Sequence, residues 1–163
     1  LFTLWIRRNL EEPEAWRRTP SHERGQVGAL FTADRARVTV AIIAMNAATL
    51  FGWWGLNSWI PAYLNLGAER GGIGLPSETM SLFVLAMQVG MWLGYVSFGY
   101  VADAFGRKRT YVAFLVLASL LLSLYGNLRT PWVLLLLGPL VAFFGTGYYS
   151  GFGALIADLY PAA

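Results

Sequence analysis

The sequence predicts an all-α membrane protein, a polytopic bundle of helices that cross a lipid bilayer. Two observations predict this fold class. Of the 163 residues, 56% are apolar and only 13% are charged, whereas soluble domains average about 25% charged residues. The charged residues also gather in a few segments, and four long stretches between them contain none. Lipid is therefore the expected surrounding for most of the chain.

The four uncharged stretches are each long enough to span a bilayer as an α-helix. The shortest, 110–128, would cover about 29 Å at 1.5 Å per residue, close to the hydrocarbon thickness of roughly 30 Å. A helix that faced water along one side would carry charge on that side, and these stretches carry none. We therefore predict four transmembrane helices, over 38–66, 79–102, 110–128 and 130–157.

Polar residues separate these spans from a short apolar start. Residues 1–6 are expected to form the end of a preceding transmembrane helix, and residues 7–37 a cytoplasmic connector. Residues 38–163 then form a bundle of four helices. Because the chain opens with Leu1 rather than Met, we expect it to be an internal piece of a longer protein.

The positive charges predict the orientation of the spans. Of the twelve Lys and Arg residues, seven lie in the connector and three in the loop 103–109, which leaves only Arg70 and Arg129 for the other two loops. Positive residues near span ends are retained in the cytoplasm, so the connector and the loop 103–109 should be cytoplasmic. The net charge of +3 is thus a topology signal, and we expect no nucleic-acid partner.

The residue types present argue against an enzyme. The chain has no Cys and a single His, His22, which lies in the connector. The four spans contain no Lys, Arg, Asp or Glu, so they offer no convergent nucleophiles, bases or metal ligands. We expect no catalytic residues, no metal and no cofactor.

Neutral polar and aromatic side chains instead share one face of two spans. At 100° per residue, Asn46, Trp53 and Asn57 fall together on the first span, and Gln88, Trp92 and Tyr95 on the second. Amides are costly in lipid and should point into the bundle, where they either bond other helices or line a cavity. Gln88 is the strongest ligand candidate because its amide can both donate and accept. The candidate substrate-pathway residues are Asn46, Trp53, Asn57, Gln88, Trp92, Tyr95 and Tyr148.

Small residues predict close contacts between helices. Gly90 and Gly94 are four residues apart on the second span, and Gly147 and Gly151 repeat this spacing on the fourth. Such pairs let another helix approach closely. Pro61 and Pro139 can weaken the helical hydrogen bonds locally and allow bending.

The loop between the second and third spans carries a recognisable motif. Its sequence from Gly99 to Arg109 resembles the G-x-x-x-D-x-x-G-R-K/R signature of the major facilitator superfamily, a family of transporters with repeated halves. The matching residues are Gly99, Asp103, Gly106, Arg107 and Lys108. The resemblance implies a partial six-helix half of such a transporter. Because a basic connector precedes the spans, it places them in the C-terminal bundle, as helices seven to ten.

A second segment extends the resemblance to the end of the chain. Asp158-Leu159-Tyr160-Pro161 is similar to the E-L-F-P pattern that closes the tenth helix in this family. The resemblance implies that Asp158 pairs with Arg107 at the cytoplasmic end. These two residues and the motif would together form a cytoplasmic gate.

The resemblance implies secondary active transport by alternating access. The run 147–161 and the connector are similar to bacterial proton symporters, which indicates a small organic acid or a sugar-like metabolite as solute and the plasma or inner membrane as location. Partners would be this solute, membrane lipid and the missing N-terminal half of the same chain. The alternative is a four-span scaffold or receptor-like protein without transport activity.

Overall fold

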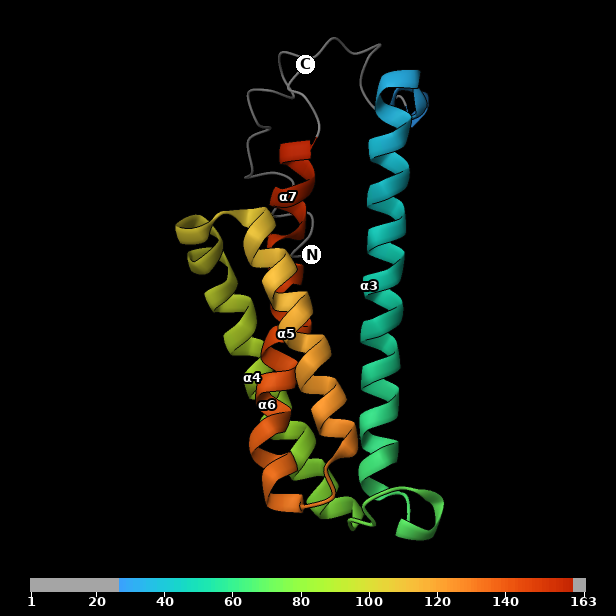
Figure 1. Ribbon diagram of the computed structural model, residues 1–163, viewed down its shortest axis with the longest axis vertical. Coiled ribbons are helices and arrows are strands. Elements are labelled where there is room, and N and C mark those ends of the chain that lie inside the picture. The colour runs from blue at the N-terminus through green and yellow to red at the C-terminus, as the bar shows by residue number, and fades with distance from the viewer. Residues whose placement is uncertain (1–26, 160–163) are drawn as a thin grey trace, which may run out of the picture. The chain divides into compact units, whose positions relative to one another are not determined.

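The computed structural model describes residues 27–159, and every regular element within that range is helical (Figure 1). The chain divides into two units, residues 1–40 and 41–163. The predicted helix end at 1–6 and the connector up to residue 26 lie outside the described residues.

In the first unit, a short 3-10 helix leads into the start of a long α-helix. Helix η1 covers Val27–Phe31 and α3 covers Ala33–Asn65, so α3 begins ahead of the uncharged stretch. The hydroxyl of Thr39 donates to the backbone oxygens of Leu30, at 2.7 Å, and Arg35, at 3.0 Å. These two bonds fix η1 against the first turns of α3.

In the second unit, the rest of α3 is followed by three further spans. They are α4 (Ser77–Phe105), α5 (Arg107–Asn127) and α6 (Pro131–Gly147), and the last continues through η3 (Tyr148–Gly151) into α7 (Phe152–Leu159). Four helices within the described residues are long and apolar enough to cross a membrane. The four predicted spans are confirmed. The fourth, however, contains the 3-10 turn η3 between α6 and α7, which the sequence analysis did not predict.

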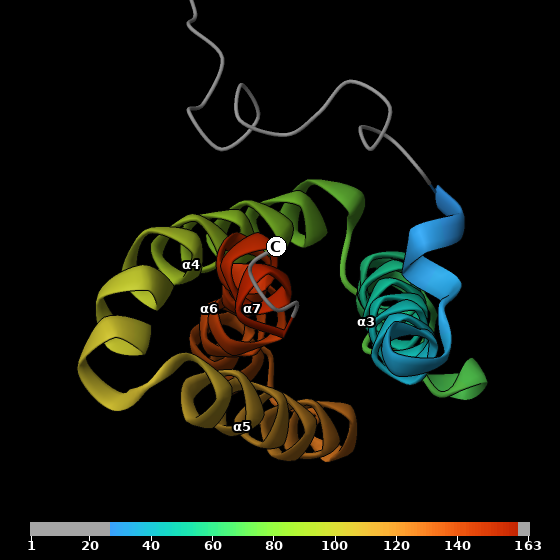
Figure 2. The same ribbon diagram turned by 90° about the horizontal axis from the view of Figure 1, so that it is seen from above.

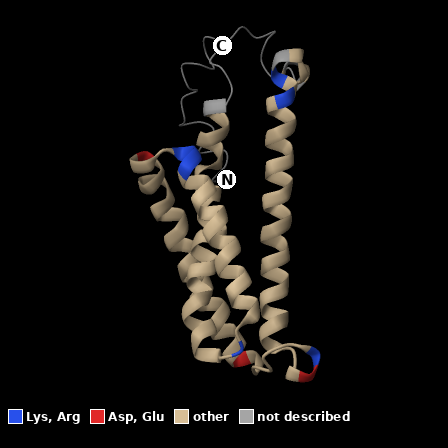
Figure 3. Ribbon diagram, viewed as in Figure 1, with Lys and Arg blue, Asp and Glu red and all other residues tan. Residues whose placement is uncertain are grey.

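Helix α6 lies between α4 and α5 (Figure 2). Charged residues of this unit lie at the two ends of the spans, and the middle of the spans has none (Figure 3). We call the end that carries Asp103, Arg107, Lys108 and Arg109 the basic end. The far end carries the loops 66–76 and 128–130, including η2 (Ala68–Arg70).

The contact between α4 and α6 depends on glycine. A Cβ atom on Gly90 would lie 2.1 Å from the backbone oxygen of Pro139, and one on Gly94 would lie 2.4 Å from that of Phe143. The two backbones therefore approach so closely that no larger residue fits at either position. The predicted close helix contact at Gly90 and Gly94 is confirmed, and it makes α4 and α6 the tightest pair of spans.

Two buried clusters fill the space between the helices. Toward the far end, Ile60 and Leu64 of α3 pack with Tyr125 and Leu134 of α5 and α6. Toward the basic end, a second cluster is largely aromatic and contains Phe98, Tyr111, Phe114 and Tyr148. The far end of α3 thus belongs to the core.

A network at the far end ties α3 to the loop between α5 and α6. The hydroxyl of Tyr63 donates to the backbone oxygen of Leu128 at 2.6 Å, and the guanidinium of Arg129 stands 5.5 Å from the Tyr63 ring centroid. One nitrogen of that guanidinium also donates to the backbone oxygens of Gly71 and Gly72. We call this network the Arg129 clamp, since one side chain holds two loops together.

The topology predicts opposite labelling of two exposed alanines. Because the chain has no cysteine, Ala68→Cys in η2 and Ala104→Cys near the basic end each introduce a single thiol. A membrane-impermeant maleimide should label Ala68→Cys on intact cells, and Ala104→Cys only after permeabilisation, since the basic end is expected in the cytoplasm. Labelling of both thiols from the same side would contradict the predicted orientation.

Candidate functional site

The motif from Gly99 to Arg109, which resembles the major facilitator signature, contains the tight turn between α4 and α5. Gly106 has a φ of 92°, a conformation that side-chain-bearing residues rarely adopt. Its N–H donates to the backbone oxygen of Ala102 at 2.9 Å, and its own oxygen accepts from the N–H of Thr110 at 3.0 Å. The turn therefore requires glycine at this position, and it connects two spans with almost no loop.

The other motif residues surround this turn. Gly99, Asp103 and Lys108 are exposed, and Arg107 is the first residue of α5. The side chain of Asp158 lies outside the described residues, so its pairing with Arg107 stays a prediction.

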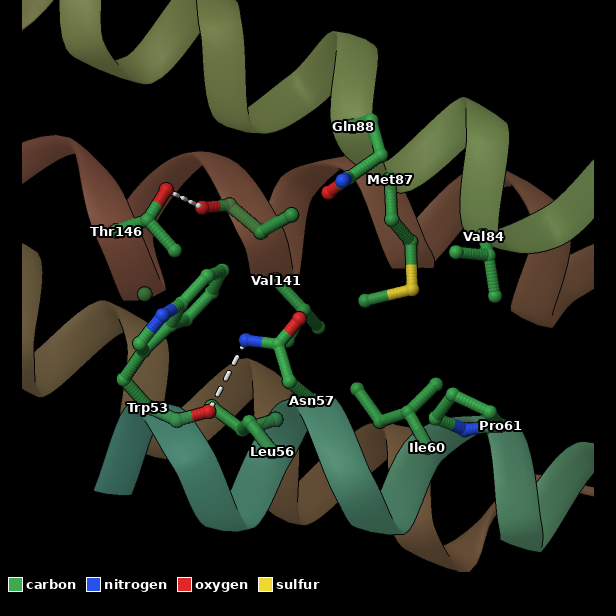
Figure 4. Close-up of a pocket in the computed structure, with 12 residues that line it drawn as sticks. Trp53, Leu56, Asn57, Ile60, Pro61, Val84, Met87, Gln88, Val141 and Thr146 are labelled. Carbon is green, nitrogen blue, oxygen red and sulfur yellow. Dashed lines mark hydrogen bonds between the residues drawn. The ribbon is translucent and has the colours of Figure 1, made fainter. Parts of the chain in front are cut away.

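A pocket lies between α3, α4 and α6 (Figure 4). We call it the amide pocket, because Asn57 of α3 and Gln88 of α4 point into it from opposite walls (Figure 4). It encloses about 60 Å³, room for a small chemical group. Its twelve lining residues are Trp53, Leu56, Asn57, Ile60, Pro61, Val84, Met87, Gln88, Val141, Ala142, Gly145 and Thr146.

The amide pocket retains unused hydrogen-bonding capacity. The Asn57 amide nitrogen donates to the backbone oxygen of Trp53 at 3.1 Å, which leaves its side-chain oxygen as an acceptor. Gln88 forms no hydrogen bond within the described part of the chain. Pro61 has no N–H, so the backbone oxygen of Asn57 loses its usual helical donor. The pocket therefore offers donors and acceptors without any charge.

A second cavity of about 320 Å³ lies between α3 and α5 and reaches η3. Thr49 and Trp53 line it from α3, Ser119 from α5 and Tyr148 from η3. Because Trp53 lines both spaces, the amide pocket and the second cavity share a wall.

The structure brings together only some of the predicted pathway residues. Trp53, Asn57 and Gln88 line the amide pocket, and Tyr148 lines the second cavity. Asn46, Trp92 and Tyr95 line neither. Asn46 is half-buried, and Trp92 is 61% exposed. Tyr95 is half-buried, and its hydroxyl interacts with the side chain of Thr146.

Several residues of these cavities were missed by the sequence analysis. Thr146 completes the amide pocket, and the hydroxyls of Tyr111 and Tyr149 are buried beside the second cavity's Tyr148. One signal could have found Tyr149: the fourth span is interrupted by glycines on both sides of a Tyr-Tyr pair. Interrupted spans are typical of transporter binding sites.

The fold and these cavities define a multi-pass protein of the cell membrane. Its spans surround neutral polar cavities, and among the described residues no group of three or more His, Asp or Glu could hold a metal ion. These features are typical of a membrane transporter.

Comparison with known proteins relates the chain to transporters. It is 29% identical, over 98% of its length, to a Haemophilus influenzae protein whose name assigns it to metabolite transport. It is 30% identical over 61% of its length to the cis,cis-muconate transport protein of Acinetobacter baylyi, and 26% identical over 71% to the sialic acid transporter NanX of Escherichia coli. The relatives confirm the resemblance to major facilitator transporters.

The chain spans only part of these relatives, namely 41%, 25% and 27% of their lengths in the same order. No family model matches the chain, and no solved structure gives a significant match.

Proposed function

We propose that these residues form part of the C-terminal half of a secondary transporter, and that the complete protein moves a small organic acid across the cell membrane. Residues 38–163 would contribute four of the six helices of that half. An N-terminal half of the same polypeptide and the surrounding lipid would be its partners. The relatives named for muconate and sialic acid support a solute with a carboxylate over an uncharged sugar, because both named solutes are carboxylic acids.

The amide pocket is the observation that carries this proposal. It lies among three spans, and it combines an indole with two amides that face each other. Binding sites of transporters lie near the bilayer midplane and must release their solute as readily as they bind it. Neutral hydrogen-bonding groups meet both needs, because they give specificity without the tight hold of a buried ion pair.

Alternating access would involve the basic end. There the motif turn at Gly106 joins α4 directly to α5. We propose that Arg107 pairs with Asp158 in the outward-open state and holds the cytoplasmic ends of the helices together. Gly99, Asp103 and Lys108 would complete this gate.

Proton symport would require a carboxylate that changes its protonation state during transport. The four spans contain no Lys, Arg, Asp or Glu from Val38 to Leu66, Thr79 to Ala102, Thr110 to Leu128 or Thr130 to Ala157. We therefore propose that the coupling carboxylate is supplied by helices of the complete protein outside these spans.

Counterflow with the complete protein in proteoliposomes tests the function. Vesicles loaded with unlabelled muconate, sialic acid, nicotinate or glucose are diluted into the same labelled solute. We expect transient accumulation of at least one carboxylate in counterflow. In a separate uptake assay driven by a proton gradient, a membrane-permeant protonophore should abolish the accumulation of the same solute. Accumulation of none of the four solutes would contradict the proposal and favour a scaffold without transport activity.

A further inference from the structure

A third cavity, of about 400 Å³, lies at the basic end. Val101 and Phe105 line it from α4, Phe144 from α6, and residues from Arg109 to Leu117 from α5. We call it the basic-end groove. It shares no lining residue with the amide pocket or with the second cavity, so it is a separate site.

The walls of the basic-end groove are apolar and open to the surroundings of the protein. Phe105 is 71% exposed and Leu117 is 39% exposed, whereas Phe114 at the base is buried. Ala113 is exposed between them, and its small side chain leaves the space that forms the groove. In a bilayer, such apolar walls require an apolar group as cover.

The length of the groove fits an acyl chain better than a further transmembrane helix. Arg109, Ala113 and Leu117 follow one another at steps of four residues and therefore share one face of α5. From Arg109 to Leu117 the helix rises by about 12 Å, less than half of the roughly 30 Å of hydrocarbon in a bilayer. A spanning helix would cover the whole thickness, whereas the chain of one lipid stays within one leaflet.

A cation stands at the end of the groove that lies nearest the membrane surface. The Arg109 side chain is exposed, and it forms no hydrogen bond or ion pair within the described part of the chain. Among the described side chains of the basic end, three cations, Arg107, Lys108 and Arg109, outnumber one carboxylate, Asp103 (Figure 3). The groove therefore combines an apolar channel with a positively charged mouth.

We propose that the basic-end groove binds one anionic phospholipid, with the phosphate on the Arg109 guanidinium and an acyl chain along Ala113 and Leu117. A guanidinium binds phosphate through two parallel hydrogen bonds. A zwitterionic head group would add an ammonium beside three cations, so a lipid with net negative charge is preferred. The basic end is expected in the cytoplasm, where the leaflet is anionic and basic pockets between spans bind lipid head groups.

The test compares three variants of the complete protein, purified in detergent. Arg109→Gln removes the cation at the mouth, and Ala113→Phe fills the groove but keeps every charge. Lys108→Gln is the matched control, because Lys108 is the exposed cation next to Arg109 but does not line the groove. Arg109 is exposed, so its replacement should leave the fold intact, and melting temperature verifies this for each variant.

The measured quantity is the Kd of the first bound lipid, determined by native mass spectrometry for dioleoyl phosphatidylglycerol and dioleoyl phosphatidylethanolamine. We expect the parent protein to bind phosphatidylglycerol more tightly. Arg109→Gln should raise the Kd for this lipid about tenfold, the equivalent of one charge-assisted hydrogen bond. Ala113→Phe should raise it by a similar factor, since the acyl chain no longer fits, and Lys108→Gln should change it less than about twofold.

Other results would overturn the inference. Equal losses in Arg109→Gln and Lys108→Gln would indicate diffuse attraction of anionic lipid by the basic end. An unchanged Kd in Ala113→Phe would mean that no acyl chain occupies the groove. Equal affinities of the parent protein for the two lipids would exclude a site for anionic lipid, and would leave the proposed transport function untouched because no solute enters this measurement.

Discussion

Alanine at Gly90 is expected to destabilise the protein by about 2–3 kcal/mol, the cost of forcing extra atoms into a well-packed contact. The added Cβ would lie 2.1 Å from the backbone oxygen of Pro139. A backbone atom cannot turn aside as a side chain can, so α4 and α6 must move apart. Thermal unfolding of the purified protein in detergent measures the effect, and we expect a fall of several degrees in melting temperature.

Gly99→Ala is the matched control for this substitution. Gly99 lies on the same helix, and a Cβ there would meet nothing within 4 Å. Alanine favours a helix over glycine by roughly 1 kcal/mol, so this variant should be as stable as the parent protein or more so. Equal melting temperatures for Gly90→Ala and Gly99→Ala would show that the two helices do not touch at Gly90.

Leucine at Asn57 or at Gln88 is expected to reduce solute transport by about tenfold each, the equivalent of one lost hydrogen bond of about 1.4 kcal/mol. Leucine resembles both side chains in size but can neither donate nor accept. The amides face each other across the amide pocket, so a bound solute would leave its own polar group unpaired. The measurement is kcat/KM for uptake of the solute identified by counterflow.

Asn127→Leu provides the control for the amide substitutions. Like Asn57, Asn127 is exposed and donates to the backbone oxygen four residues earlier, that of Ser123, at 2.8 Å. Unlike Asn57, it lines neither cavity. Its replacement should leave uptake unchanged. A similar loss in all three variants would mean that amide removal acts through helix stability rather than through the solute.

The sequence was sufficient to predict the spans and their closest contact. A long helix without charged residues is expected to lie in lipid, and this expectation follows for each helix from its own sequence alone. The close helix contact at Gly90 and Gly94 was equally predictable from the sequence, because only small residues allow two helical backbones to touch.

The candidate site was predictable only in part. A helical wheel gives the angle between side chains on one helix, but it does not give the neighbour that each face meets. Gln88 and Trp92 are only about 40° apart by that measure, yet Gln88 lines the amide pocket and Trp92 is 61% exposed.

The contact of Tyr111 with the neighbouring pair Tyr148 and Tyr149 lay beyond this kind of reasoning. Tyr111 and Tyr149 belong to different spans, so their proximity depends on how α5 packs against η3. Tyr148 and Tyr149 also lie in the 3-10 turn Tyr148–Gly151, which the sequence pattern did not indicate.

The Arg129 clamp determines how α3 can move relative to the other spans. With Tyr63 held at the far end, α3 can still tilt about this anchored point, or bend at Pro61, without breaking the clamp. Thr49 is about 21 Å along the helix from Tyr63, so a tilt of roughly 10° would displace it by about 4 Å. The same tilt hardly moves the anchored end, so small rotations would open the second cavity much more than the amide pocket.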